Sequence, residues 1–141
     1  MKLQVKRTEL WTGELDDRPG AVAGKLAAVS EARANLDFVL ARRTPESPGK
    51  AVIFLSPIRT PRQVRAAGAA GLRKAGGLFA VRVEGPDKPG LGACVTEALA
   101  AAGINLRGLC AAVIGKRFVA HLAMDTADDA DKAVRALRGL K

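Results

Sequence analysis

The motif DRPG at residues 17–20 returns as DKPG at residues 87–90, and these two stretches decide the fold. Each copy follows a stretch that is typical of a strand and precedes one that is typical of a helix. An Asn-Leu pair follows each copy, at residues 35–36 and 105–106, so both features recur after 70 residues (87 − 17 and 105 − 35). These matched positions in register indicate an internal duplication.

The elements around the two copies follow the same order in each half, namely strand, helix, strand, strand, helix. Apolar alternation and continuous apolar runs predict the strands, and apolar residues at helical spacing predict the helices. The expected strands are residues 2–15 with a bend near 7–9, 35–43, 51–55, 78–83, 105–114 and 117–124. The expected helices begin near Pro19, Thr60, Gly90 and Asp125, with Asp17 and Thr60 as N-caps.

The boundary between the halves is expected at the Gly-Gly pair 76–77, which gives a first unit at residues 1–75 and a second at residues 76–141. A four-stranded split-βαβ unit needs one strand more than each half contains. We expect residues 2–7 to fill the vacancy beside the sheet of the second half as an N-terminal strand. Part of residues 76–84 is expected to serve both units.

Composition predicts a cytoplasmic protein with an aliphatic core. Hydrophobic residues make up 48% of the 141 residues but aromatic residues only 4%. No apolar run approaches the about 18 residues of a membrane span, and residues 1–7 lack the apolar core of a secretion signal. The net charge of +9 favours contact with anions, but the basic residues are spread along the chain, which favours a solvated basic surface.

The residues that usually carry chemistry are few, so we expect neither an enzyme nor a metal site nor a cofactor. Cys94 and Cys110 fall at apolar positions and are expected to be buried reduced thiols. The one histidine, His121, lies inside an apolar strand, where we expect it to be packed or half-exposed. The acidic residues between 125 and 131 are explained by the preference of a helix N-terminus for negative charge.

With this element order and the two D-x-P-G turns, the sequence resembles a tandem ACT-domain protein, over nearly the whole chain. The resemblance also rests on GINL at residues 103–106, from which the first half departs with RANL at residues 33–36. It implies an α+β fold of two ferredoxin-like βαββαβ units in tandem, with antiparallel sheets placed edge to edge. It further implies amino-acid sites at the seam, between the first loop of one unit and the helix-to-strand turn of the other.

The helix that follows each Pro-Gly pair opens with free amides, which form a natural receptor for a carboxylate. Glycine lets a ligand approach the backbone closely, asparagine both donates and accepts, and aspartate pairs with an ammonium group. The candidate ligand-binding residues implied by the resemblance are Asp17, Gly20, Ala21, Asn35, Leu36, Asp87, Gly90, Leu91, Asn105 and Leu106.

Structural roles compete with these assignments. The turn is needed to join a strand to a helix whether or not a ligand binds, the asparagines serve to satisfy the backbone of a turn, and the aspartates are typical helix caps. If only one half keeps its site, the closer match to the family pattern favours the second.

The predicted function is reversible binding of an amino acid or similar small carboxylate by a regulatory homodimer. One alternative is a protein–protein interaction module, which would act on a partner enzyme. A second alternative is RNA or DNA binding on a sheet face that carries Phe38 and Phe54. The sequence argues against this alternative, because its strands lack the clustering of lysine, glycine and aromatic residues typical of such a face.

Overall fold

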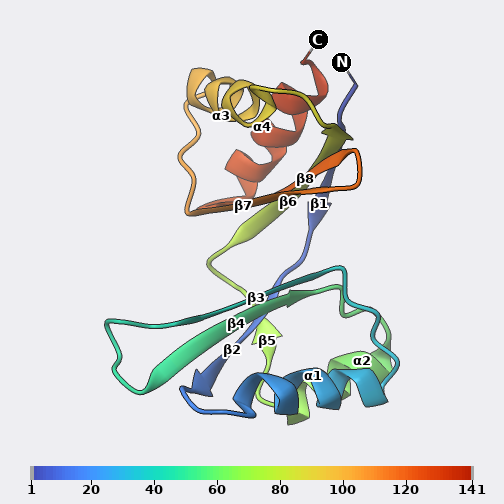
Figure 1. Cartoon of the computed structure of the whole chain (residues 1–141), viewed down its shortest axis with the longest axis vertical. Coiled ribbons are helices and arrows are strands. Elements are labelled where there is room, and N and C mark those ends of the chain that lie inside the picture. Colours follow the sequence, from blue (N-terminus) through green and yellow to red (C-terminus); the bar gives the residue numbers. More distant parts are fainter. Residues whose placement is uncertain (1, 141) are drawn as a thin grey trace. The chain divides into compact units, whose positions relative to one another are not determined.

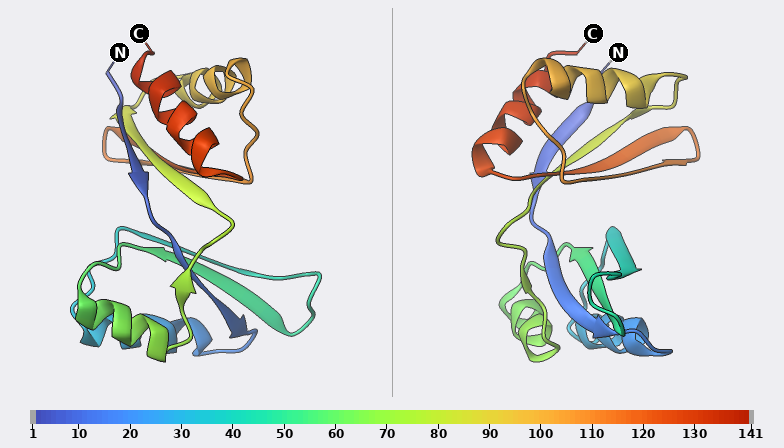
Figure 2. Two further views of the ribbon diagram at one scale, coloured as in Figure 1. Left: turned by 180° about the vertical axis from the view of Figure 1, so that it is seen from behind. Right: turned by 90° about the vertical axis from the view of Figure 1, so that its left-hand side faces the viewer.

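The computed structural model describes residues 2–140, which form two compact α+β units. Glu9–Ala75 form the first, which we call the inserted unit. Residues up to Thr8 together with those from Gly76 onward form the second, which we call the split unit. Each unit has one antiparallel four-stranded sheet with two helices on one of its faces (Figures 1 and 2). The ferredoxin-like fold class expected for both units is confirmed.

The inserted unit contains β2 (Trp11–Asp16), α1 (Ala21–Glu31), β3 (Phe38–Arg43), β4 (Lys50–Ser56), α2 (Pro61–Ala69) and β5 (Arg73–Lys74). Its strands lie in the order β3-β4-β2-β5. Alternate residues of β2 and β4 point toward the helices, and they form the core with side chains such as Val29 of α1 and Ala67 of α2. Thr60 caps α2 as expected, in a capping box with Gln63.

The split unit contains β1 (Gln4–Thr8), β6 (Phe79–Pro86), α3 (Leu91–Ala101), β7 (Gly108–Ile114), β8 (Arg117–Met124) and α4 (Ala127–Arg138). Its strands lie in the order β1-β6-β8-β7, and its core is aliphatic. None of the helices among residues 2–140 is both long and apolar enough to cross a membrane.

The N-terminal strand completes the sheet of the split unit, as predicted. β1 pairs with β6 from Gln4 opposite Glu84 to Thr8 opposite Ala80. Leu3 and Val5 are buried in the core of this unit, and the guanidinium of Arg138 at the end of α4 donates to the Val5 carbonyl at 2.8 and 3.2 Å. Residues up to Thr8 therefore form one compact unit with those from Gly76 onward, and Glu9–Ala75 form the other.

The closing strand of the inserted unit differs from the prediction. β6 pairs with β1 and β8, both of its own unit, so residues 76–84 are not shared. Instead α2 ends at Ala69, Gly71 turns the chain with a φ of 83°, and β5 adds two residues beside Trp11 and Thr12. The rest of β2, from Gly13 to Asp16, has no strand partner on that side among the described residues.

Candidate ligand-binding site

The loop from β2 to α1 ends in a helix start with open amides. Gly20 adopts a left-handed φ of 89°, and the first helical hydrogen bond runs from the Gly24 amide to the Gly20 carbonyl at 2.9 Å. The Ala21 amide donates to the Arg18 carbonyl at 3.3 Å. The amides of Val22 and Ala23 precede the helical hydrogen-bond ladder, so they are free to meet a ligand.

The loop from β6 to α3 has the same geometry. Gly90 has a φ of 82°, the Cys94 amide donates to its carbonyl at 2.9 Å, and the Leu91 amide donates to Lys88 at 3.2 Å. No heavy atom lies within 4 Å of a Cβ built on Gly20 or Gly90, so the left-handed conformation rather than crowding requires glycine. The duplicated motif therefore builds one turn twice.

The predicted capping role of the motif aspartate is wrong for both helices. Their N-caps are Gly20 and Gly90, which have no side chain, and neither helix has a side-chain cap hydrogen bond. The carboxylate of Asp17 instead accepts from Arg43 Nε at 2.8 Å. Pro19 was expected in the first helical turn, but it precedes the N-cap, as Pro89 does in the other unit, because the glycine must turn the chain first.

The predicted asparagines do not lie near the loop of their own unit. Asn35 and Asn105 are exposed and follow the C-terminal ends of α1 and α3, whereas the loops lie at the N-terminal ends. Each helix has 11 residues, which separates its ends by about 16 Å. Leu36 and Leu106 are half-buried against their cores, and Leu91 is buried in the core of the split unit.

A polar hollow opens beside the first loop, in the inserted unit. It has a volume of about 180 Å³, far more than the roughly 15 Å³ that suffices for one water. Its walls are Glu14, Leu15, Asp16, Arg18, Ala21, Lys25 and Lys50. Of the residues predicted from the sequence, the hollow contains Ala21.

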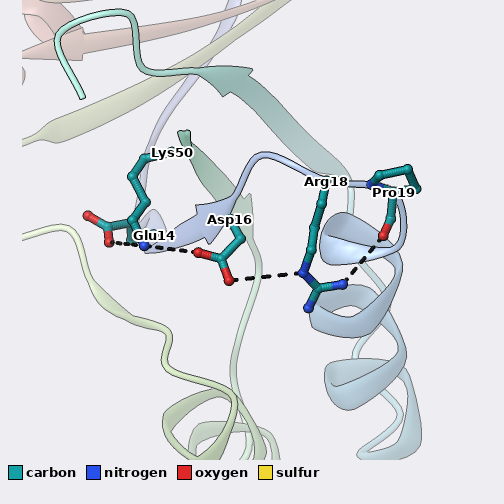
Figure 3. A network of polar contacts seen from close by, with 5 residues as sticks. All are labelled: Glu14, Asp16, Arg18, Pro19 and Lys50. Carbon is teal, nitrogen blue, oxygen red and sulfur yellow. Dashed lines mark hydrogen bonds and ion pairs between the residues drawn. The ribbon is translucent and has the colours of Figure 1, made fainter. Parts of the chain in front are cut away.

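Four of the five charged residues of the hollow, all but Lys25, form a connected network, which Figure 3 shows from close by. Lys50 Nζ lies 2.9 Å from an Asp16 carboxylate oxygen and 3.6 Å from one of Glu14. Arg18 lies 4.0 Å from Asp16 and also reaches the Pro19 carbonyl. The hydrogen bond and the charge of Lys50 lower the pKa of Asp16, and the same contact raises the pKa of Lys50.

Sequence reasoning missed these charged residues for an identifiable reason. Glu14 and Asp16 alternate along a predicted strand, which places both side chains on one face. Lys50 joins them only because β4 pairs antiparallel with β2 and places Lys50 opposite Asp16. No local pattern in the sequence gives that register.

The fold and the two loops define a class of protein, a pair of ferredoxin-like modules that each open a helix with free amides. Within that class, residues 78–140 match the family described as the ACT domain. The structural similarities below confirm the tandem fold of two ferredoxin-like units expected from the sequence, and the family match covers the second half of the chain. Comparison with curated protein sequences gave no significant match.

Solved structures with the same fold include whole chains of similar length and a part of a longer enzyme. Protein BT0572 from Bacteroides thetaiotaomicron has a TM-score of 0.77 at 11% identity, over 93% of this chain and 88% of that one. The ligand-free regulatory subunit of aspartate kinase from Thermus thermophilus has a TM-score of 0.67 at 18% identity, over 97% and 95%. Aspartate kinase from Synechocystis has a TM-score of 0.65 at 15% identity, over 99% of this chain and 27% of that one.

Proposed function

We propose that this protein binds an amino acid or a similar small carboxylate reversibly and acts as a regulator rather than as an enzyme. The observation that carries the proposal is the helix start built by the duplicated motif. In both units a left-handed glycine is followed by two amides outside the helical ladder, with open space above the glycine. Free amides at the positive end of a helix favour a carboxylate.

The proposed contacts extend from these glycines to the other residues predicted from the sequence. Gly20, Ala21, Gly90 and Leu91 supply backbone at the helix starts, and Asp17 and Asp87 lie three residues before the glycines. The turns Asn35-Leu36 and Asn105-Leu106 lie at the far ends of the helices, so they serve a ligand held by the loop of another unit. A seam between units as the place of binding stays a prediction.

Regulation would follow from a shift of populations, because a ligand that contacts two units favours the placement in which it touches both. We propose that the protein acts as a homodimer on a separate enzyme. The regulatory subunit of aspartate kinase from Thermus thermophilus, which has the same tandem fold, supports a target of this kind.

Thermal unfolding of the full chain with each of the twenty amino acids at millimolar concentration tests the proposal. We expect one amino acid or a small chemical group of them to raise the melting temperature, because binding only the folded state stabilises it. The double variant Gly20→Ala/Gly90→Ala should lose the response, and circular dichroism should show that it still folds, because each left-handed alanine costs about 1 to 2 kcal/mol. If no amino acid raises the melting temperature, the interaction-module alternative is favoured. If binding to RNA or DNA is found and falls steeply with salt, the nucleic-acid alternative is favoured.

A further inference from the structure

The inserted unit leaves part of a strand edge open inside the polar hollow. Leu10 accepts from the Ala75 amide at 2.9 Å, so its backbone groups face the β5 side of the strand. Because backbone groups alternate along a strand, those of Thr12, Glu14 and Asp16 face the same side. Thr12 lies opposite Arg73, where the pairing with β5 ends.

The open edge has the hydrogen-bonding pattern of a parallel strand pair. The Asp16 carbonyl is used locally, because it accepts from the Arg18 amide at 2.9 Å. The Glu14 carbonyl and the Asp16 amide have no strand partner on this side of β2, and one residue, Leu15, separates them in the chain. In a parallel pair, such a carbonyl and amide are bridged by the N–H and C=O groups of one residue on the next strand. The ammonium and carboxylate of a free amino acid present the same donor and acceptor.

The split unit closes the equivalent place with its own residues. There Gln4 of β1 lies opposite Glu84, the counterpart of Glu14 after the shift of 70 residues. Leu3 fills the space beside Gly85, the residue that follows Glu84, because a Cβ on Gly85 would lie 2.5 Å from Leu3 Cδ2. In the split unit, β1 therefore covers the strand edge that the two-residue β5 leaves open in the inserted unit.

Lys25 adds a positive charge to the hollow and takes no part in its ion-pair network. Its counterpart in the split unit is Val95, a core residue that is 1% exposed, whereas Lys25 is half-buried in the wall of the hollow. Lys25 Nζ donates to the Ala70 carbonyl, and no ion pair to it occurs among the described residues. The other four charged side chains of the hollow are joined to one another by ion pairs.

We propose that the ligand of this hollow is a dicarboxylic amino acid, an inference that rests on the proposed amino-acid binding. Three basic and two acidic side chains give the walls a formal charge of +1 (3 − 2), and a dicarboxylic amino acid carries −1. Its ammonium meets the Glu14 carbonyl, and its α-carboxylate meets the Asp16 amide. Its second carboxylate meets Lys25, in the opening turns of α1, the helix whose open amides support the proposed function in this unit. The strand edge thus recognises the main chain, and Lys25 selects the side chain.

Calorimetric titration of the full chain with L-aspartate, L-glutamate and their amides L-asparagine and L-glutamine tests the inference. We expect at least one acid to bind about tenfold or more tightly than its amide, because only the acid pairs with Lys25. Lys25→Met should abolish this preference, and Lys25→Arg should restore it. Emission of Trp11, the one tryptophan, shows whether each variant keeps the core of the inserted unit folded.

A matched pair of variants locates the site. Arg18 lines the hollow, and its counterpart in the split unit is Lys88. We expect Arg18→Met to weaken binding several-fold and Lys88→Met to leave it unchanged. The inference would be overturned if L-asparagine and L-glutamine bound as tightly as the two acids, or if only Lys88→Met weakened binding. Either result would leave the proposed function standing. The absence of binding by any of the twenty amino acids would overturn both.

Discussion

Glu84 is a carboxylate held between two arginines on the face of the split unit's sheet that carries no helices. Arg82 Nη1 lies 2.8 Å from one of its carboxylate oxygens, and Arg117 Nε lies 3.4 Å from the other. Burial raises the pKa of Glu84, but the charges and hydrogen bonds of the two arginines outweigh this effect. The pKa therefore lies below its ordinary value of 4.5.

This lowered pKa predicts a pH-dependent contribution to stability. The unfolded chain binds the proton more readily, so the contribution is complete above pH 4.5 and is lost as the pH falls through the folded value. We expect Glu84→Gln to lower the free energy of unfolding by about 1 to 3 kcal/mol at pH 7, the range for hydrogen bonds to charged groups. Urea unfolding followed by far-UV circular dichroism at pH 7, 5 and 3 measures the difference, which should shrink toward pH 3.

Glu97→Gln is the control for this experiment, because Glu97 is exposed on α3. Its unfolding curves should coincide with those of the parent protein at all three pH values. A difference between Glu84→Gln and the parent that stays constant from pH 7 to pH 3 would show that the loss is one of packing and not of charge.

At the scale of residues, the sequence predicted the backbone of the candidate site better than its side chains. The duplicated motif placed Gly20 and Gly90 at the helix starts, because glycine in a strand-to-helix turn has a definite conformational reason. Lys25 gave no such signal, because a lysine four residues into an amphipathic helix is expected to face solvent. Lys25 lines the hollow because β5 has only two residues and leaves the rest of the β2 edge uncovered.

At the scale of elements, the C-terminal ends of α1 and α3 show one turn built from two different residues. Arg33 has a φ of 67° and Gly103 a φ of 74°, and these are equivalent positions. The hydrogen bonds match as well, because the following residues, Ala34 and Ile104, donate to Val29 and Leu99 at 3.1 and 3.0 Å. A left-handed conformation costs a residue with a Cβ about 1 to 2 kcal/mol.

This comparison predicts opposite effects of two substitutions. Arg33→Gly should stabilise the inserted unit by up to about 1 kcal/mol, because the relief of strain exceeds the added chain entropy of glycine. Gly103→Ala should destabilise the split unit by about 1 kcal/mol for the converse reason. Urea unfolding measures both, with Trp11 emission for the first and circular dichroism for the second. A loss of stability in Arg33→Gly would mean that contacts of the arginine side chain outweigh the strain.

The order of elements was largely predictable, and the exception has a physical cause. Strands with apolar alternation or apolar runs, such as β4 and β8, were found at nearly the expected positions, as was the capped start of α2. The two-residue strand β5 was missed, because Arg73 and Lys74 are exposed and have no apolar pattern. Its existence depends on pairing with β2, and a tertiary partner of this kind leaves no trace in local sequence.

At the scale of the whole molecule, the chain makes one ferredoxin-like unit from its two ends and the other from its middle. The inserted unit follows the chain order βαββαβ. In the split unit, β1 comes first in the chain but takes the place of the last strand of that order. Because Trp11 lies in the core of the inserted unit, its emission follows that unit alone. Deleting residues 2–8 should therefore leave the emission of Trp11 intact while lowering the stability of the split unit by several kcal/mol.

The split unit should fold by itself once its chain order is restored. We predict that residues 76–141, followed by a short glycine linker and residues 2–8, form a stable monomeric unit, because Leu3 and Val5 then regain their places in the core. Burying such a side chain contributes about 1.5 to 3 kcal/mol, so residues 76–141 alone should be unfolded or marginal. Thermal unfolding followed by circular dichroism compares the two proteins, with Val5→Lys in the permuted protein as the control for specific pairing. If the permuted protein, its Val5→Lys variant and residues 76–141 alone had equal melting temperatures, β1 would add an edge strand to the sheet without completing the core.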